Sequence, residues 1–378
     1  MIQKLLLEDH FNEFIMKKKV FLFVMLLCFG FFSTKANPIS KKAILSKVHK
    51  VADWQLKNPN EISMLDWVQG PFINGVMAIG NLPGGKKYIR AVNKIGQKEK
   101  WEVINTEWKA NDHCTPQSWL EMFEIKKNPT MVEPIRKELD KVIEVVSKQD
   151  DALEFQSRNS MKWSWCDALY MAPPTFARLG KVTGEQKYYD FLNQWWWKVS
   201  AFYYDTEEHL YFRDQNWFPK REPNGAKVFW SRGNGWVIGG LVRVLQYLPE
   251  NDPYRPKYEQ QLREMLAKIK EIQGKDGLWG AGILDRNAHK QAETSGSAFF
   301  VYGMAYAINN GIVERSAFEP TAEKAWIALG KYITPDGCFT GIQPIGDSPV
   351  KYDENYSMPY GVGAFLLAAS EMYKLQEK

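Results

Sequence analysis

Residues 232–248 read RGNGWVIGGLVRVLQYL, and this pattern is typical of a helix that is buried on several sides. A polar and aromatic start leads into a segment with helical periodicity and many small residues. Because small side chains let a helix pack closely against its neighbours, the segment is predicted to lie in an inner layer. The same kind of segment occurs six times along the chain. The six copies start near Trp67, Trp119, Asp167, Trp236, Ala298 and Gly361.

Six helical stretches of a second kind alternate with these segments. Each carries Lys and Glu on one side and Leu, Ile, Val or aromatic residues on the other, as a half-exposed helix does. These outer stretches are residues 40–56, 86–96, 132–147, 185–202, 254–273 and 319–331. Six inner and six outer helices in strict alternation predict an all-α fold, an (α/α)6 barrel of six helical hairpins.

Three similar loops connect an outer stretch to the next inner segment. Two of them read DGLW at residues 276–279 and DGCF at residues 336–339, and the third is residues 207–211. Glycine supplies the positive φ that a tight turn needs. We expect the aromatic residue that follows each turn to point inward.

The first 36 residues predict an export signal. Residues 16–19, which read MKKK, precede an uncharged apolar run at 20–32, and small residues follow it. This is the pattern of a secretory signal, and the run is too short for a stable membrane span. Residues 1–15 fit no signal and are interpreted as an upstream extension. Residues 37–378 then form a single catalytic barrel domain, exported to the periplasm or beyond, with no stable membrane anchor.

The composition of the 378 residues narrows the class of protein. With 45% hydrophobic, 14% aromatic and 25% charged residues, the chain is predicted to be globular. The 49 Lys and Arg and the 44 Asp and Glu are interspersed, and no basic tract indicates a nucleic-acid partner. The 15 Trp residues indicate sugar platforms in an aromatic cleft, or else a large helical core that uses Trp.

Cysteine and histidine are both scarce. Beyond the predicted signal the chain has Cys114, Cys166 and Cys338, an odd number without metal-ligand spacing. We expect buried, unpaired thiols and at most one disulfide bridge. The 5 His residues include no pair at ligand spacing, and no P-loop, Rossmann or G-x-S-x-G motif is present. We therefore expect neither a metal nor an organic cofactor.

Asp167 lies in the most aromatic cluster of the chain, residues 161–173. Trp163 and Trp165 precede it, and Tyr170 follows it. Apolar surroundings disfavour the charged form of a carboxyl group and raise its pKa, as a general acid requires. The alternative is that Asp167 caps the next helix. The two flanking tryptophans favour the catalytic role.

Two further clusters carry candidate residues. Asp112 and His113 precede Pro116, which suits the first turn of an inner helix; taken alone, this cluster is better explained by a helix cap and a surface residue. Arg232 lies between Trp230 and Trp236, where it can stack on a ring and present a planar fork of donors to a carboxylate.

A fourth polar cluster, ETSGSA at residues 293–298, is expected to cap a helix through Thr or Ser. Because the sequence shows neither a metal-binding nor a nucleophile motif, we expect the catalytic chemistry to be acid–base chemistry by carboxylates in an aromatic cleft. That chemistry is typical of glycoside hydrolysis.

Three motifs in this order resemble a known family. They are WCDALYMAP at 165–173, RGNGW at 232–236 and ETSGSA at 293–298. Together they resemble the unsaturated rhamnogalacturonyl hydrolases of glycoside hydrolase family 105 over essentially the whole chain beyond the signal. The related unsaturated glucuronyl hydrolases of family 88 share the fold and have similar acidic residues.

The resemblance implies an (α/α)6 barrel that removes a 4,5-unsaturated uronyl residue from the non-reducing end of an oligosaccharide. Such ends are left by polysaccharide lyases, and the pectin or rhamnogalacturonan type is expected. The resemblance implies that Asp167 protonates C4 and that water adds at C5. It also implies that Asp112 positions or activates this water.

The resemblance further implies which residues contact the substrate. These are Arg232, Trp230 and Trp236, and we add Trp165 and His113 as candidates. At residue 213 the chain has Arg where many members of the family carry His. Arg213 is expected to offer its charge to the uronate, and this difference leaves the preferred leaving sugar open.

Three alternatives remain at this point. The chain could hydrolyse glycosaminoglycan-derived or other unsaturated uronates, or it could be an ordinary (α/α)6 glycosidase of saturated sugars. It could also be a barrel that binds saccharides without catalysis. The sequence predicts neither the parent polysaccharide nor the oligomeric state.

Overall fold

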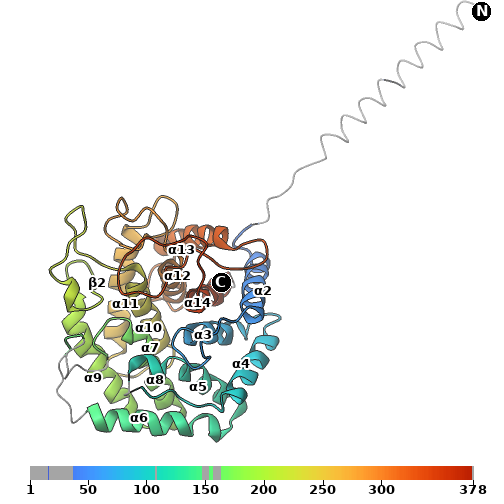
Figure 1. Ribbon diagram of the computed structural model, residues 1–378, viewed down its shortest axis with the longest axis vertical. Coiled ribbons are helices and arrows are strands. Elements are labelled where there is room, and N and C mark those ends of the chain that lie inside the picture. Colours follow the sequence, from blue (N-terminus) through green and yellow to red (C-terminus); the bar gives the residue numbers. More distant parts are fainter. Residues whose placement is uncertain (1–15, 17–36, 107–108, 147–152, 156–162, 377–378) are drawn as a thin grey trace, which may run out of the picture. The chain divides into compact units, whose positions relative to one another are not determined.

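The computed structural model describes residues 16, 37–106, 109–146, 153–155 and 163–376. The chain divides into two units, Met1–Asn37 and Pro38–Lys378, and every element labelled in Figure 1 lies in the second. Apart from Met16, the predicted export signal falls outside the described residues and stays a prediction. No helix among the described residues is long and apolar enough to span a membrane.

The inner layer consists of six helical segments, one of them formed by two consecutive helices. They are α3 (Gly70–Ile79), α5 (Pro116–Lys126), α7 (Ala168–Met171) with α8 (Pro173–Thr183), α10 (Ser231–Leu245), α12 (Thr294–Asn309) and α14 (Pro359–Leu375). Every residue of α10 is buried. Small residues make close packing possible: a Cβ on Gly75 of α3 would lie only 2.7 Å from the carbonyl oxygen of Gly363 in α14. The predicted role of the small residues is confirmed.

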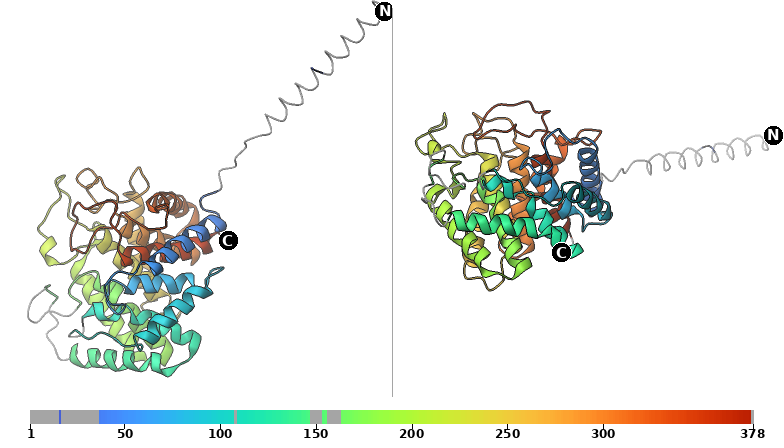
Figure 2. Two further views of the ribbon diagram at one scale, coloured as in Figure 1. Left: turned by 45° about the vertical axis from the view of Figure 1, so that its right-hand side comes forward. Right: turned by 60° about the horizontal axis from the view of Figure 1, so that its bottom comes forward.

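Amphipathic helices surround this layer, as Figures 1 and 2 show. They are α2 (Lys41–Lys57), α4 (Lys86–Lys98), α6 (Glu133–Val146), α9 (Gln186–Tyr203), α11 (Arg255–Glu271) and α13 (Arg315–Leu329). In α4 the buried residues are Tyr88, Val92 and Gly96, one on each successive turn, as the amphipathic pattern predicts. The predicted alternation of inner and outer helices is therefore confirmed.

The largest error in the predicted outer helices concerns the start of α13. The predicted stretch begins at residue 319, whereas the helix begins at Arg315 and contains Pro320 in its second turn. Pro320 is the sixth residue of the helix, just past the first four residues whose N–H groups have no helical partner, so it costs the helix one backbone hydrogen bond. The proline is therefore inside the helix instead of marking its beginning.

The remaining elements are short. They are the 3-10 helices η1 (Ala110–His113), η2 (Pro129–Met131), η3 (Gln215–Trp217) and η4 (Gly330–Tyr332), and the antiparallel strands β1 (Tyr204–Asp205) and β2 (Leu210–Tyr211). Gly277 and Gly337 adopt φ angles of 94° and 114°, which confirms the predicted turns. In the third loop, which has no glycine, His209 takes the left-handed conformation with a φ of 53°.

Aromatic residues contribute heavily to the core. The aromatic residues after the three turns are all buried, as predicted: Tyr211, Trp279 and Phe339. Among the largest fully buried side chains are those of Trp119, Trp163, Trp196, Trp236, Trp279 and Trp326. The helical-core explanation therefore accounts for much of the Trp content.

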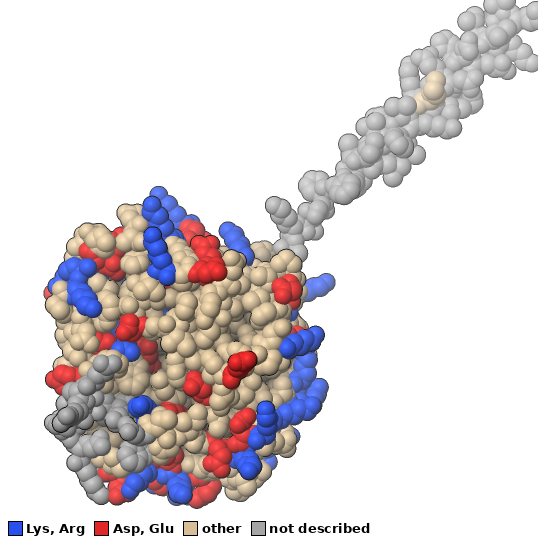
Figure 3. All heavy atoms as spheres, in the orientation of Figure 1, with Lys and Arg blue, Asp and Glu red and all other residues tan. Residues whose placement is uncertain are grey.

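Hydrogen bonds join the loops that lead into the inner helices. The backbone N–H of Ser231 donates to Ala281, and that of Thr294 donates to Gly341. These loops and the N-terminal ends of the inner helices form one end of the barrel, the mouth; the C-terminal ends of the inner helices form the opposite end, the far end. On the face that Figure 3 shows, charged side chains of both signs are scattered around a largely uncharged middle.

Candidate active site

Asp167 is the residue immediately before α7, at the mouth. Its side chain makes no capping hydrogen bond to the helix, so the capping explanation is wrong. Instead, the Sγ of Cys166 donates to its Oδ1 at 3.1 Å. The residue is partly exposed, yet burial of its carboxyl group by the surrounding protein raises its pKa above the usual range. This is the direction that a proton donor requires.

Two arginines and a second aspartate act electrostatically on Asp167. Burial is the largest influence on its pKa; Arg213, the thiol of Cys166 and Arg232 lower the pKa, and Asp214 raises it. Burial outweighs the two guanidinium groups, so the net shift is upward. The site therefore combines an acid whose pKa is raised with two guanidinium groups that suit an anionic ligand.

Arg213 lies in the loop that follows β2. Its Nη1 donates to Asp214 at 2.6 Å, and its guanidinium lies 4.1 Å from the ring centroid of Phe155. Its Nε is buried and has no hydrogen-bond partner within the part of the chain that the structure describes. One donor of this cation therefore remains for a ligand.

Arg232 is held in the first turn of α10 by backbone carbonyls and aromatic rings. Its Nη1 donates to the carbonyl of Gln343 and its Nη2 to that of Pro344, the latter at 2.9 Å. The guanidinium lies 4.4 Å from the ring centroid of Trp230 and 4.9 Å from that of Tyr360. Arg232 forms no ion pair with any described residue. In this it differs from Arg178, Arg213 and Arg243, which each pair with a carboxylate. The predicted stacking on Trp230 is confirmed.

Gly233 allows α10 to approach the acid closely. A Cβ at this position would lie 3.2 Å from the Sγ of Cys166 and 3.6 Å from the Oδ1 of Asp167. Asn234, the next residue, holds β2 in place: it accepts from the N–H of Tyr211 at 2.8 Å and donates to its carbonyl at 3.0 Å. The RGNGW motif therefore joins the acid, the arginine and the β2 loop.

Trp236, whose predicted contact with substrate stays a prediction, is buried in the structure, as Arg232 and Trp230 are. Its side chain is 1% exposed and packs between Tyr170 and Phe299, with ring centroids 4.9 and 4.8 Å away. It lies one helical turn beyond Arg232 on the same face of α10, further from the mouth. Trp165 is partly exposed and lies edge-to-face against Phe155, with centroids 6.0 Å apart.

Asp112 lies inside η1 and does not act as its cap. Both carboxylate oxygens accept hydrogen bonds from Thr106, whose N–H and Oγ1 donate at 2.7–2.9 Å. Burial raises the pKa of Asp112, while the bonds from Thr106 oppose this shift. Because η1 packs against α7, the structure brings the segments of Asp112 and Asp167 together.

The expectation of a substrate contact at His113, and the alternative of a surface position, are both wrong. The side chain is fully buried, with its ring edge-to-face against Phe176 at 6.3 Å. Its Nε2 lies 3.7 Å from the Oε1 of Glu138, which belongs to the outer helix α6. His113 therefore faces the outer layer instead of the mouth.

Gln343, which sequence analysis missed, connects several parts of the mouth. Its Oε1 accepts from the Nε1 of Trp230 at 2.9 Å, and its carbonyl accepts from Arg232 and from Tyr360. Its N–H donates to Glu293 at 3.2 Å. A single Gln in an irregular loop more than a hundred residues from Trp230 gives no sequence signal for this role.

Glu293, not Thr or Ser, caps α12. Its carboxylate accepts from the N–H groups of Ser295 and Gly296 at 3.2 and 2.6 Å. The hydroxyl of Thr294 instead donates to the carbonyl of Thr340 at 2.8 Å. The ETSGSA motif is therefore a helix cap, as expected, but through a different residue.

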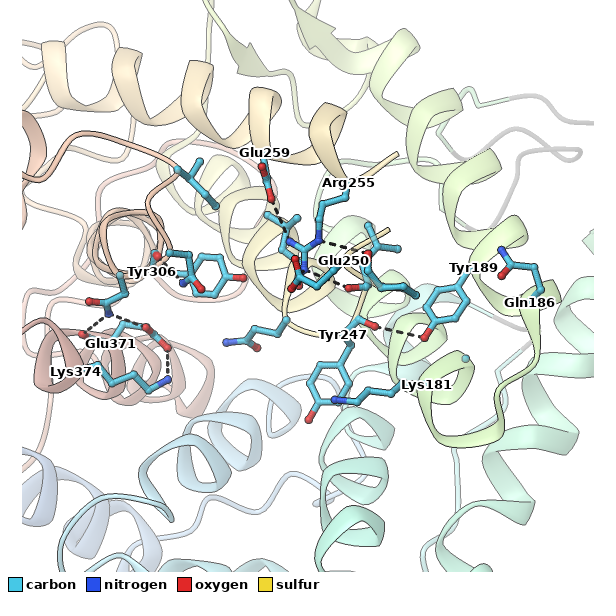
Figure 4. A pocket seen from close by; sticks show the side chains of 18 of the residues that line it. Lys181, Gln186, Tyr189, Tyr247, Glu250, Arg255, Glu259, Tyr306, Glu371 and Lys374 are labelled. Atoms are coloured by element: carbon cyan, nitrogen blue, oxygen red, sulfur yellow. Dashed lines mark hydrogen bonds and ion pairs between the residues drawn. The ribbon is translucent and has the colours of Figure 1, made fainter. Parts of the chain in front are cut away.

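A cavity of about 1060 Å³ lies at the far end, and Figure 4 shows its lining. Its charged side chains are paired: Arg255 with Glu250 and Glu259, and Lys374 with Glu371. None of the predicted site residues lines it. Among the described residues, no group of three or more His, Cys, Asp or Glu could hold a metal ion.

The chain is similar to known proteins along nearly its whole length. The model of Glycosyl Hydrolase Family 88 matches residues 39–376. The unsaturated 3S-rhamnoglycuronyl hydrolase of Formosa agariphila is 33% identical over 90% of this chain and 93% of its own. The enzyme of the same name from Alteromonas sp. (strain LOR) is 31% identical over 81% and 77%.

A solved structure agrees with these matches. The glycosyl hydrolase family 88 protein from Bacteroides vulgatus has a TM-score of 0.80 and 26% identity, covering 89% of this chain and 99% of its own. The resemblance predicted from the sequence, to the hydrolases of families 105 and 88, is confirmed. The predicted barrel is confirmed with it.

Proposed function

This chain belongs to Glycosyl Hydrolase Family 88, and we propose that it removes a 4,5-unsaturated uronyl residue from an oligosaccharide in which a rhamnose follows. The observation that carries this proposal is the setting of Asp167. Its pKa is raised by burial, and it lies within the electrostatic reach of two arginines. An acid of this kind can protonate carbon, and the two cations suit the carboxylate of the uronyl group.

Asp167 is the proton donor in the first step. Its O–H bond breaks, and the electron pair of the C4=C5 double bond forms a new C–H bond at C4. The positive charge left at C5 is shared with the ring oxygen. This step needs a protonated acid at the working pH, which the raised pKa of Asp167 supports.

Asp112 directs the water that adds to C5. The water oxygen bonds to C5 and its proton passes to Asp112, whose raised pKa makes it a stronger base. The resulting hemiketal opens to a ketone at C5, and the hemiacetal formed at C1 releases the next sugar as an alcohol. One water is consumed, and solvent returns the proton from Asp112 to Asp167.

Arg232 and Arg213 hold the anionic sugar at the mouth. The guanidinium of Arg232 is fixed by two carbonyls and two rings, and the buried Nε of Arg213 has no hydrogen-bond partner among the described residues. Preorganised cations of this kind bind a carboxylate with little loss of side-chain entropy.

The identity of the next sugar rests on the relatives. Two of them, 33% and 31% identical, are named unsaturated 3S-rhamnoglycuronyl hydrolases, and this supports the same class of substrate here. The second candidate is an unsaturated rhamnogalacturonyl oligosaccharide, which the motifs at 165–173 and 232–236 support.

The test is a turnover assay with oligosaccharides made by lyases. The conjugated C4=C5 bond absorbs in the ultraviolet, and its loss reports the first step. We expect turnover of the unsaturated 3S-rhamnoglycuronyl substrate, slower turnover of the rhamnogalacturonyl one, and none of glycosaminoglycan disaccharides. If the enzyme cleaves saturated glycosides while the absorbance of the lyase-made oligosaccharides stays unchanged, the proposed mechanism is wrong. If the protein binds these oligosaccharides without any turnover, the barrel is non-catalytic.

We propose that the enzyme acts outside the cytoplasm, because residues 16–36 have the pattern of an export signal. N-terminal sequencing of the protein recovered from its native cells should then start near Asn37. A mature chain that retains residues 20–32 would contradict this proposal.

A further inference from the structure

We propose that Cys166 is a positioning residue for the proton of Asp167. The thiol donates to Oδ1, which makes Oδ1 the carbonyl oxygen of the acid and leaves the transferable proton on Oδ2. The inference rests on the proposed role of Asp167 as proton donor. Sequence analysis assigned this cysteine only a small, buried apolar role.

The geometry around the thiol leaves it little freedom. Cys166 is fully buried, and its Sγ lies 3.1 Å from the Oδ1 of Asp167. Its own N–H donates to the carbonyl of Arg213 at 2.9 Å, which ties this residue to the loop after β2. On the other side, the Cα of Gly233 approaches so closely that a Cβ there would lie 3.2 Å from Sγ. The S–H group is therefore directed at the acid by its surroundings.

A carboxylic acid has two oxygens, and only one of them carries the proton. A thiol is a weak donor, but at a buried site it biases which oxygen accepts and which carries hydrogen. Because a proton transfer to carbon depends on the position of that hydrogen, fixing it on one oxygen aligns the acid before the substrate binds. The neighbouring thiol performs this alignment without adding charge to the site.

The thiol also shifts the ionisation of the acid in a known direction. A donor to Oδ1 stabilises the carboxylate, so Cys166 lowers the pKa of Asp167 and thereby opposes the effect of burial. The other charged groups that act on Asp167 are Arg213 and Arg232, which lower its pKa, and Asp214, which raises it. On the neighbouring η1 lie Asp112 and His113. Substituting Cys166 leaves all of these in place.

The experiment compares Cys166→Ala with Cys166→Ser in the full-length enzyme. The pH profile of kcat/KM is measured through loss of the C4=C5 absorbance. Ala removes the donor, so the alkaline limb should move to higher pH by about 0.5–1 unit, and kcat at low pH should fall about tenfold. Ser restores a donor, so its alkaline limb should return to within a few tenths of a unit of wild type.

Cys114→Ala is the matched control, because Cys114 is also fully buried but is not bonded to Asp167. It should lose stability as Cys166→Ala does while its alkaline limb stays in place. The inference is wrong if wild type, Cys166→Ala and Cys166→Ser have the same alkaline limb in the pH profile of kcat/KM after correction for the folded fraction. Cys166 would then serve packing alone.

Infrared spectroscopy provides a second test that does not depend on activity. The difference spectrum between wild type and Cys166→Ala isolates the S–H stretching band of Cys166. This band should shift as Asp167 ionises, and the shift should vanish in Asp167→Asn; an unshifted band would overturn the proposal. A fully active Asp167→Asn enzyme would instead refute the proposed function, so the two failures are distinguishable.

Discussion

Buried arginines have different partners at the two ends of the barrel. At the far end, Arg178 and Arg243 both bind Glu121: Arg178 through Nε and Nη2 at 2.8 and 2.6 Å, and Arg243 through Nη2 at 2.8 Å. At the mouth, Arg232 donates to backbone carbonyls and stacks on rings, without an ion pair to any described residue. At the far end two arginines thus share one carboxylate, whereas at the mouth Arg213 is paired with Asp214 and Arg232 has no ion pair among the described residues.

The carboxyl groups differ in the same way. Burial alone would raise the pKa of Glu121, but Arg243 and Arg178 overcome it and the net shift is downward. Around Asp167 burial prevails over Arg213 and Arg232, and the net shift is upward. The surroundings of Glu121 thus favour its charged form, which binds arginines of two helices, whereas the surroundings of Asp167 favour its protonated form. Charged groups at the far end are expected to set stability, and those at the mouth to set rate.

Asp167→Asn should have the largest effect. Asn keeps the shape but has no proton to give, so kcat should fall by about three orders of magnitude. The folded-state pKa of Asp167 is raised, so wild-type stability is lost as pH rises from the unfolded pKa through the folded one. Asn has no such loss, and its melting temperature at neutral pH should equal or exceed that of wild type.

The control for this prediction is Asp190→Asn, because Asp190 is exposed on the outer helix α9. It should leave both kcat and the melting temperature unchanged. An Asp167→Asn enzyme with more than a tenth of wild-type kcat would show that the proton comes from another group. A large loss of stability would instead show that the mouth acid is structural.

Glu121→Gln should have the next largest effect, and on stability instead of rate. It leaves two buried guanidinium groups without their carboxylate, which costs about 3–5 kcal/mol in the free energy of unfolding. Urea denaturation measures this loss, while kcat per folded molecule should change less than twofold. Glu124→Gln, three residues further along α5, removes a partly exposed carboxylate that lies 3.7 Å from Lys181 and accepts from the hydroxyl of Tyr247 at 2.8 Å. Because Gln still offers Tyr247 an oxygen, this substitution should cost less than about 1 kcal/mol.

Substituting Lys for Arg at each end compares the two sites directly. Lysine has neither the planar fork nor the stacking surface of arginine. Arg232→Lys should lower kcat/KM about 10- to 100-fold, mainly through KM, and should also cost about 1–3 kcal/mol in unfolding free energy, because Arg232 is buried and Lys cannot bond both carbonyls. Arg243→Lys should lower the unfolding free energy and leave KM unchanged. If Arg232→Lys unfolds the protein while KM is unchanged, the mouth arginine serves packing and not the substrate.

The barrel could be predicted because its pattern is local. Small residues along 232–248 and the amphipathic pattern of 86–96 each fit one layer, and helical periodicity repeats within a few turns. Asp167 was found for the same reason, since its aromatic neighbours precede and follow it in sequence. Features that a short stretch determines can be derived from that stretch alone.

The errors arise where distant segments meet. Gln343 contacts Trp230 across more than a hundred residues, and no pattern within its own loop indicates this contact. Trp236 was a substrate contact implied by the family resemblance, and the sequence gives no sign that its ring packs between Tyr170 and Phe299. His113 is buried because of how its ring packs on Phe176 of α8, which lies more than sixty residues away.

Asp214→Asn should have the smallest effect. It tests whether the negative charge of Asp214 offsets that of Arg213 and so keeps the pKa of Asp167 high. Asp214 is buried, pairs with Arg213 at 2.6 Å and raises the pKa of Asp167. Asn removes this negative charge and leaves Arg213 free to stabilise the carboxylate of Asp167. The pKa of the acid then falls, and the alkaline limb of kcat/KM should move to lower pH by about 0.5–1 unit.

This shift is opposite in sign to the one expected for Cys166→Ala, so the double variant should have a limb near that of wild type if the two neighbours act independently. Because Asn still accepts the N–H of Asn216, which Asp214 binds at 2.9 Å, the loop should keep its shape. A limb that moves upward in Asp214→Asn would mean that Arg213 had left the acid. In that case the mouth would hold its charge through Arg232 alone.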